Sequence, residues 1–220
     1  GIYDVGMVFN ADSYPAFGLQ TMGEKAIAAT QPDGNMSLDL KIEQVKQYPT
    51  KDGEVTEILL KDKVYPFEIK QYYKAYQGTD IISTWIEIMN NGKKSVTLYR
   101  FVSAYLPVQR GDNWLTHFHG HWGAENMLEE EKLTNGQKVI SNKDGMVNTE
   151  TDNPSFMLSI DGKPQEEYGH ILGGTLAWTG NYLLKMDITN TKLNIIAGIN
   201  EENSHYKLEP KETFKTPEFA

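Results

Sequence analysis

Residues 80–106 decide the fold class, and they read Asp80-Ile-Ile-Ser-Thr-Trp85-Ile-Glu-Ile-Met-Asn90-Asn-Gly-Lys-Lys-Ser95-Val-Thr-Leu-Tyr-Arg100-Phe-Val-Ser-Ala-Tyr-Leu106. Apolar residues alternate at period two on both sides of the Asn-Gly pair, which is the pattern of two β-strands. An Asn-Gly pair between two such runs predicts a hairpin. Because both faces of the runs are apolar, we expect a central hairpin that is covered above and below, with Trp85 in a core.

The rest of the chain repeats short strand patterns and has no long segment with a helical period. Turn residues at 33–35 predict a hairpin from 24–30 back through 38–42, and Asp52-Gly53 predicts another. Residues 127–133 are expected to form a short helical turn. Further strands are expected at 8–9, 42–48, 55–60, 64–76, 138–142, 155–160, 171–178, 182–188, 193–199 and 208–214. The fold class is therefore all-β, as a large antiparallel sandwich.

Composition excludes several classes of function. The 220 residues can form one large β domain. A net charge of −9 argues against nucleic acid as a partner, because phosphate binding needs a basic surface. There are no cysteines for a disulfide or a thiolate zinc site. No apolar run approaches the ~20 residues that cross a membrane, and the first residues do not resemble a signal peptide. The compartment stays open between cytoplasmic, periplasmic and secreted.

Three alternating histidines, His117, His119 and His121, would share one face of a strand. Three imidazoles can bind zinc, but the outer two would lie about 13 Å apart on a regular strand. We therefore expect no metal here, and either hydrogen-bonded surface histidines or a contact with a sugar or a partner.

No residue pattern identifies a catalytic centre or a cofactor site. Acidic residues are abundant, but nothing in their spacing selects a pair for acid–base catalysis. The sequence also lacks a nucleophile elbow, a phosphate-binding glycine loop and a His-Glu-x-x-His zinc motif. We expect neither a catalytic residue nor a cofactor in this chain.

The four tryptophans divide into two pairs. Trp85 and Trp178 lie inside strand patterns and are expected in the core. Trp114 and Trp122 flank the histidines in segment 112–126, which breaks the strand rhythm. Aromatic residues with polar neighbours suit a sugar or a partner surface, so we expect this segment to be a surface excursion that a partner covers.

A set of segments, occurring in a fixed order, resembles the N-terminal domain of glycoside hydrolase family 36 α-galactosidases of the melibiase type. The segments are Tyr14-Pro15-Ala16-Phe17-Gly18, Asp33-Gly34-Asn35, Val64-Tyr65-Pro66-Phe67-Glu68, Glu87-Ile88-Met89-Asn90-Asn91-Gly92, residues 114–122, Asp152-Asn153-Pro154-Ser155-Phe156, Trp178-Thr179-Gly180-Asn181, Ala197-Gly198-Ile199-Asn200 and residues 208–218.

The resemblance implies a galactose-mutarotase-like β-supersandwich over residues 1–220, followed by a (β/α)₈ barrel. In that family the two catalytic aspartates lie on the barrel, and the Lys-Trp-Asp motif of the nucleophile is absent here. This chain would be a non-catalytic accessory domain of a retaining α-galactosidase that acts on α-galactosides. The family often forms homo-oligomers in which loops of this domain reach a neighbouring subunit's sugar site. The residues expected to contact a sugar or an interface are Tyr14, Trp114, His117, His119, His121 and Trp122.

A second function stays open at this point. A stand-alone sugar-binding protein, or an enzyme of the mutarotase or epimerase type, would need histidine and glutamate in a concave groove. The residues that could supply them are His117, His119, His170 and Glu87. Fold kinship alone does not choose between these functions.

Overall fold

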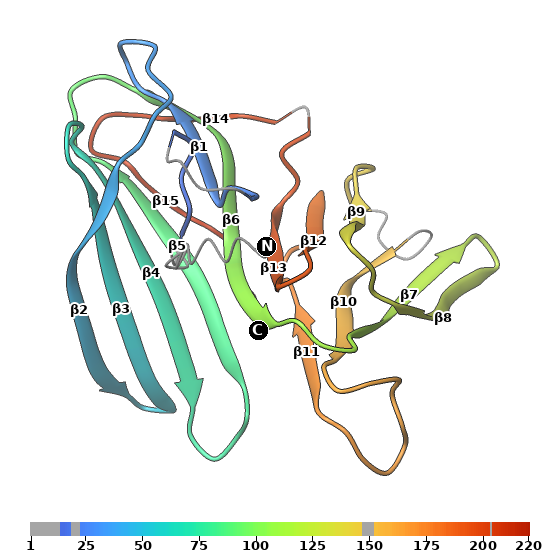
Figure 1. Cartoon of the computed structure of the whole chain (residues 1–220). Helices are drawn as coiled ribbons and strands as arrows, with labels where there is room; N and C mark the ends of the chain where they lie inside the picture. Colours follow the sequence, from blue (N-terminus) through green and yellow to red (C-terminus); the bar gives the residue numbers. More distant parts are fainter. Residues whose placement is uncertain (1–13, 19–22, 147–151, 203) are drawn as a thin grey trace, which may run out of the picture.

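The computed structural model describes residues 14–18, 23–146, 152–202 and 204–220. Regular structure in these ranges consists of strands β1 to β15, which confirms the all-β class (Figure 1). Within the same ranges no helix has the length and apolarity to cross a membrane. The strand expected at 8–9 lies outside the described residues.

The strands form three antiparallel sheets. The five-stranded sheet has the order β15-β5-β4-β3-β2 and contains β2 (Leu40–Thr50), β3 (Gly53–Asp62), β4 (Phe67–Tyr76), β5 (Ile82–Asn90) and β15 (Thr213–Lys215). The six-stranded sheet has the order β1-β6-β13-β12-β9, with β14 also paired to β6, and contains β1 (Ile27–Thr30), β6 (Val96–Gln109), β9 (Gly136–Asn142), β12 (Tyr182–Ile188), β13 (Lys192–Ile199) and β14 (Tyr206–Leu208). The four-stranded sheet has the order β11-β10-β7-β8 and contains β7 (Trp114–His121), β8 (Ala124–Lys132), β10 (Asp152–Ser159) and β11 (Ile171–Thr175).

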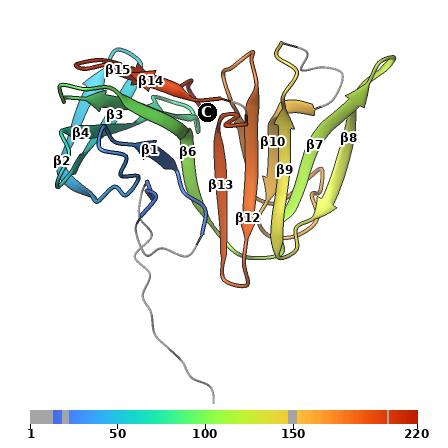
Figure 2. The same ribbon diagram turned by 90° about the horizontal axis from the view of Figure 1, so that it is seen from above.

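The six-stranded sheet lies between the other two, so the domain has three layers and two cores (Figure 2). Neighbouring residues of β13 show the arrangement, because successive side chains of a strand point to opposite faces. Ile196 packs in the first core, against the five-stranded sheet, and Ile195 packs in the second core, against the four-stranded sheet. This is the supersandwich expected from the resemblance.

Strand β6 crosses from one core to the other. Leu98 is fully buried in the first core, and Ala104 is buried in the second. The register slips between Ala197 and Gly198 where β13 pairs with β6, and such a bulge bends a strand. The expectation that this run is covered on both sides is confirmed for the second half of β6, whereas Tyr99 in the first half is 42% exposed.

The hairpin predicted for residues 80–106 is wrong. Strands β5 and β6 belong to different sheets, and the five residues 91–95 carry the chain from one layer to the next. The Asn90 side chain stabilises this connection in place of hairpin hydrogen bonds. Its Nδ2 donates to the carbonyl oxygens of Lys94 at 2.9 Å and Leu208 at 3.1 Å. The apolar faces of β5 and β6 therefore meet across the first core instead of lying side by side.

Other local predictions have mixed outcomes. The turn at 33–35 is confirmed, because Gly34 N donates to Gln31 O at 2.9 Å, but β1 and β2 lie in different sheets and form no hairpin. The hairpin at Asp52-Gly53 is confirmed by the pairing of β2 with β3. The helical turn at 127–133 is wrong, since β8 pairs with β7 as a regular strand. The expected strand at 208–214 is two short strands, β14 and β15, in two sheets.

The two tryptophans expected in a core both lie outside it. Trp85 is half-buried on the outer face of the five-stranded sheet, where its ring stacks on Tyr72 at 4.8 Å with an angle of 7° between the planes. The Lys215 ammonium lies 4.8 Å from the centre of the same ring. Trp178 follows β11 and is 40% exposed. Alternation within a strand does not tell which face of an outer sheet is covered, and this caused the error for Trp85. Trp178 was misplaced because β11 ends at Thr175, before it.

The C-terminal segment connects the outer layers. Phe219 N donates to Thr84 O of β5 at 2.9 Å, and Ala220 N donates to Thr175 O of β11 at 3.0 Å. One side of this segment thus belongs to the five-stranded sheet and the other to the four-stranded sheet.

Two isoleucines of β5 on the same face provide a test of the first core. Ile88 is fully buried and Ile82 is 58% exposed. We predict that Ile88→Ala lowers the free energy of unfolding by about 2–5 kcal/mol, because it leaves a cavity, whereas Ile82→Ala changes it little. Urea unfolding of the two variants measures the difference, and equal losses would contradict the two-layer packing of β5.

Candidate functional site

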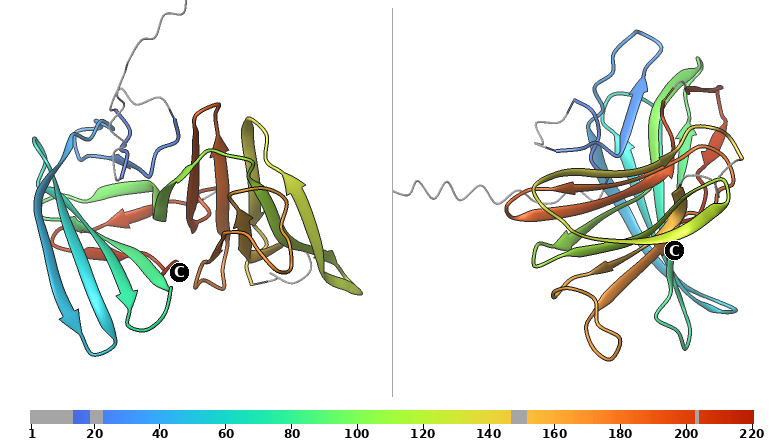
Figure 3. Two further views of the ribbon diagram at one scale, coloured as in Figure 1. Left: turned by 60° about the horizontal axis from the view of Figure 1, so that its bottom comes forward. Right: turned by 90° about the vertical axis from the view of Figure 1, so that its right-hand side faces the viewer.

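Segment 112–126, expected as an excursion, is largely a β-hairpin at one edge of the molecule. Strand β7 pairs with β10 on one side and with β8 on the other, and β8 is the free edge of the four-stranded sheet. The hairpin lies at the opposite end of the molecule from the five-stranded sheet (Figure 3). Most side chains of β8 are exposed, including those of Met127 and Leu128.

Trp122 lies at the tip of this hairpin and is 82% exposed. Gly123 beside it has a φ of +78°, a left-handed conformation that the turn requires. Trp114, at the base, is half-buried, and the Lys163 ammonium lies 5.7 Å from the centre of its ring. Trp122 is thus free to contact another molecule, whereas Trp114 belongs to the hairpin's own packing.

The three histidines do not form one group. His117 is buried, whereas His119 and His121 are exposed. Residues 119–121 of β7 lie opposite a bulge in β8, where they pair with residues 124–127. Gly120 allows this bulge, since a side chain there would come within 2.8 Å of the Glu125 Cα. His119 Nδ1 lies 3.1 Å from Asp152 Oδ1, and His121 Nδ1 lies 3.0 Å from the Trp122 carbonyl oxygen.

His117 is buried in a cluster of charged groups between two sheets. Its Nε2 lies 3.4 Å from Glu131 Oε1 and 3.6 Å from Glu129 Oε2. Lys138 of β9 forms an ion pair with Glu131. The cluster therefore links the hairpin to the six-stranded sheet. In the ranges that the structure describes, no three histidine or acidic side chains come together as a set of metal ligands.

Tyr14 lies in the first core. It is 3% exposed, and its hydroxyl donates to the Val102 carbonyl oxygen at 2.7 Å. Burial raises the pKa of this phenol far above its ordinary value. The hydrogen bond links the Tyr14-Pro15 segment to β6. Because the Tyr14 side chain is buried, it is not accessible to a ligand, contrary to the expectation that it contacts a sugar or an interface.

In the part of the chain that the structure describes, no carboxyl group shows a clearly raised pKa. Among the described residues, each carboxyl group with a clear pKa shift has a lowered pKa. Burial alone would raise the pKa of Glu24, but the Arg100 guanidinium, 2.6 Å from Oε2, outweighs it and the net pKa lies below the ordinary value. Catalytic acids of glycosidases need a raised pKa, so these shifted groups have the character of structural partners in ion pairs or hydrogen bonds.

The residues that a mutarotase-type site would need are not brought together. Glu87 lies in the five-stranded sheet and accepts a hydrogen bond from the Tyr72 hydroxyl at 3.0 Å. His117 and His119 lie in the four-stranded sheet, at the other end of the molecule, and His170 pairs with Asp161 at 2.9 Å. The described residues thus hold no concave groove lined by this set.

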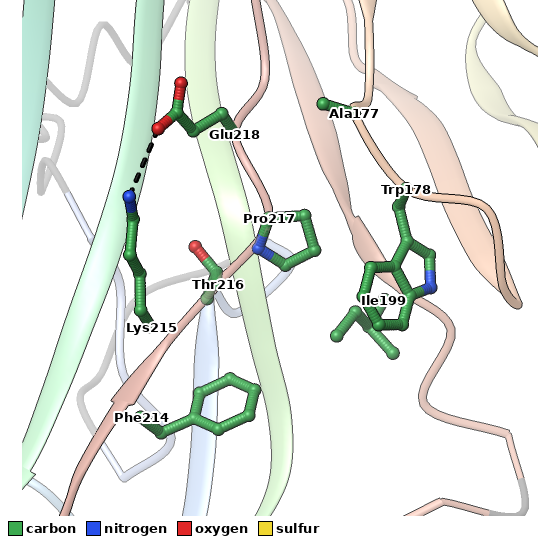
Figure 4. A pocket seen from close by; sticks show the side chains of 8 residues that line it. All are labelled: Ala177, Trp178, Ile199, Phe214, Lys215, Thr216, Pro217 and Glu218. Carbon is green, nitrogen blue, oxygen red and sulfur yellow. Dashed lines mark hydrogen bonds and ion pairs between the residues drawn. The ribbon is translucent and has the colours of Figure 1, made fainter.

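Two apolar clefts flank the C-terminal segment, and sequence reasoning missed both. The first, called the tryptophan cleft, has a volume of about 500 Å³ and lies between Trp178 and residues 214–218 (Figure 4). The Trp178 indole N–H donates to the Asn181 carbonyl oxygen at 3.1 Å, and Gly180 packs so closely that a side chain would come within 2.8 Å of the ring. These contacts hold the indole at the wall of the cleft. They give Gly180 and Asn181 a structural role beside Trp178 in the Trp178-Thr179-Gly180-Asn181 segment.

The second, called the C-terminal cleft, has a volume of about 480 Å³ and opens where the three sheets meet. Ile81, Ile82 and Leu172 line it and are each more than two-fifths exposed, and Phe219 and Ala220 form one side. One feature of the sequence indicated this apolar surface. Ile81 and Ile82 are adjacent at the start of a strand, so their apolar side chains point to opposite faces of the sheet.

Comparisons with known proteins agree with this architecture. The family model described as the glycosyl hydrolase family 36 N-terminal domain matches residues 7–209. The chain is 24% identical to α-galactosidase AgaA of Geobacillus stearothermophilus over 221 residues, which cover 93% of this chain and 30% of that protein. It is 27% identical to α-galactosidase Mel36A of Lactobacillus acidophilus over 230 residues, which cover 96% of this chain and 31% of that protein.

Solved structures show the same similarity. The crystal structure of AgaA from Geobacillus stearothermophilus superposes with a TM-score of 0.87 at 25% identity, covering 94% of this chain and 31% of that one. The α-galactosidase from Lactobacillus brevis gives a TM-score of 0.85 at 23% identity, covering 94% and 30%. The chain therefore spans less than a third of the relatives it matches.

Proposed function

The chain belongs to the glycosyl hydrolase family 36 N-terminal domain family, and from this premise we propose that it is the non-catalytic N-terminal domain of a retaining α-galactosidase-type enzyme. Residues 1–220 form one supersandwich domain, and a (β/α)₈ barrel that carries the catalytic aspartates follows it. The substrates of the whole enzyme are α-galactosides. This chain supports the barrel and the assembly of subunits.

The apolar surface around the C-terminal segment carries this proposal. Large apolar side chains are rarely left exposed together on a soluble surface unless another surface covers them. Here Ile81, Ile82 and Leu172 surround the C-terminal cleft, and Trp178 is exposed at the tryptophan cleft on the other side of the same segment. In proteins that are about three times longer than this chain, the following domain is the nearest candidate to cover both clefts.

The β7–β8 hairpin supplies a second contact surface. Its exposed tryptophan, with Met127 and Leu128 on the edge strand, has the aromatic and methionine content that is enriched in interfaces. We propose that it reaches a neighbouring subunit of a homo-oligomer, near that subunit's sugar site. Trp122, His119 and His121 are the residues that would make this contact, whereas Trp114 and His117 hold the hairpin in place.

The first test compares this chain with a longer one. We predict that pure protein of residues 1–220 does not hydrolyse an aryl α-galactoside, because it lacks the Lys-Trp-Asp motif of the nucleophile and nothing in its sequence selects a pair of acids. A protein that continues through the barrel should hydrolyse the same substrate. Turnover by the short protein that disappears on a point substitution within residues 1–220 would overturn the proposal.

The second test uses Trp122 with Trp114 as its matched control. We predict that Trp122→Ala leaves the urea unfolding midpoint of the isolated chain unchanged, since the side chain has almost no contacts to lose, whereas Trp114→Ala lowers it. In the longer protein, Trp122→Ala should shift the oligomer towards smaller species in analytical ultracentrifugation. A destabilised isolated chain together with unchanged assembly would show that Trp122 serves only the fold.

A further inference from the structure

Three segments that are distant in sequence meet at one end of the first sandwich. They are the connections between β1 and β2, between β3 and β4, and between β5 and β6, and the first two carry Asp33-Gly34-Asn35 and Val64-Tyr65-Pro66. Figure 1 shows these loops at the same end of the five-stranded sheet, opposite the turns that join β2 to β3 and β4 to β5. They enclose a cleft of about 280 Å³, called here the loop cleft.

Hydrogen bonds hold the walls of the loop cleft in one arrangement. The Tyr65 hydroxyl donates to Asp33 Oδ2 at 2.8 Å and accepts from Asn35 Nδ2 at 2.9 Å. The backbone N–H of Asn91 donates to the Pro66 carbonyl oxygen at 2.8 Å, which joins the second loop to the third. Such a network fixes the walls before any ligand arrives, so little ordering would be needed on binding.

One polar group in the cleft has no partner. Gln31 lines the cleft and is 3% exposed, and its side-chain Nε2 is buried without a hydrogen-bond acceptor. A buried amide without a partner is destabilising, so a protein rarely retains one without a reason. An acceptor atom on a bound ligand would satisfy this group once the side chain turns its Nε2 towards the cleft.

The remaining lining groups define the chemistry of that ligand. Asp33 stays ionised, because hydrogen bonds from the Asn35 backbone N–H and the Tyr65 hydroxyl lower its pKa, and its carboxylate can accept from a ligand hydroxyl. Lys93 and Lys94 are exposed at the cleft and make no ion pair within the described parts of the chain. Pro32, Pro66 and Val96 add apolar surface.

We propose that the loop cleft binds one hexopyranose unit, at a site separate from the catalytic barrel. The ring hydroxyls would accept from Gln31 Nε2 and donate to Asp33, and the C–H face of the ring would lie against the prolines. A cleft of this volume is at the small end of ligand pockets, which start at roughly 300 Å³, so it suits a single ring. Lysine ammonium groups can donate hydrogen bonds to sugar hydroxyl oxygens as well as to anions. A neutral sugar can also donate to the Asp33 carboxylate, which would repel an anionic ligand.

The test titrates the isolated chain with D-galactose and D-glucose and follows the backbone and side-chain amide signals by NMR. We expect saturable shifts of residues 31–35 and 92–94 and of the Gln31 side-chain amide, with little dependence on salt. Galactose is chosen because of the proposed function. If glucose alone produces the shifts, the pyranose site stands, but its sugar differs from the substrate class of the proposed function.

Gln31→Met is the decisive variant, with Gln47→Met as its control, because Gln47 lies on β2 and bonds Thr56 outside the cleft. We expect Gln31→Met to raise the dissociation constant at least tenfold while the urea midpoint stays equal or rises, since an unsatisfied amide is removed. Gln47→Met should bind like the native protein.

Three results would overturn the proposal. One is the absence of saturable shifts with either sugar. Another is a fall in the urea midpoint of Gln31→Met, which would show that the amide has a structural partner. The last is salt-sensitive binding of inorganic phosphate alone that disappears in the Lys93→Ala, Lys94→Ala double variant, which would identify an anion site.

Discussion

Strand β6 has apolar side chains on both faces, and burying both faces requires a layer on each side. Leu98 and Val102 pack against the five-stranded sheet, while Ala104 and Leu106 pack against the four-stranded sheet. A bulge turns the strand between the two cores, and β13 next to it repeats the division with Ile196 and Ile195. The three-layer architecture follows from this requirement, since a two-layer sandwich would leave one of these faces in water.

The sequence predicted the class and most of the strands because alternation at period two is a local property. It failed where the outcome depended on distant partners. The Asn90–Lys94 connection has the residues of a tight hairpin, yet its Asn90 amide is satisfied by the Leu208 carbonyl oxygen, 118 residues later. The same limit explains Trp85, because nothing in β5 itself tells whether its second face is covered. It also explains the helical turn expected at 127–133, where pairing with β7 overrode the weak local preference.

For the candidate site, the sequence predicted Trp122 as a contact residue, which stays a prediction, but could not show how its side chain is presented. Composition marked segment 112–126 as unusual, and the exposed tip of the β7–β8 hairpin agrees with that interpretation. Local alternation placed the three histidines together, but the structure buries His117 and leaves His119 and His121 exposed with different partners. The clefts beside the C-terminal segment are formed by three sheets at once, so no local pattern could reveal them.

The physical picture is a framework whose uncovered surfaces would carry the proposed function. Glu24 is paired with Arg100, and the charged cluster around His117 links two sheets. Exposed apolar area lies instead beside the C-terminal segment. That segment is bonded to both outer sheets, so a domain docked there would be held in a fixed orientation relative to the whole sandwich.

Hydroxyl-radical footprinting of side chains measures this central claim most directly, by comparing residues 1–220 with a protein that continues through the barrel. We predict that Trp178 and Leu172 are labelled readily in the short protein and are protected several-fold in the long one. Tyr48, on the outer face of the edge strand β2, should react equally in both. Equal labelling of Trp178 and Leu172 in the two proteins would contradict the account, because the apolar clefts would then remain uncovered in the enzyme they are proposed to support.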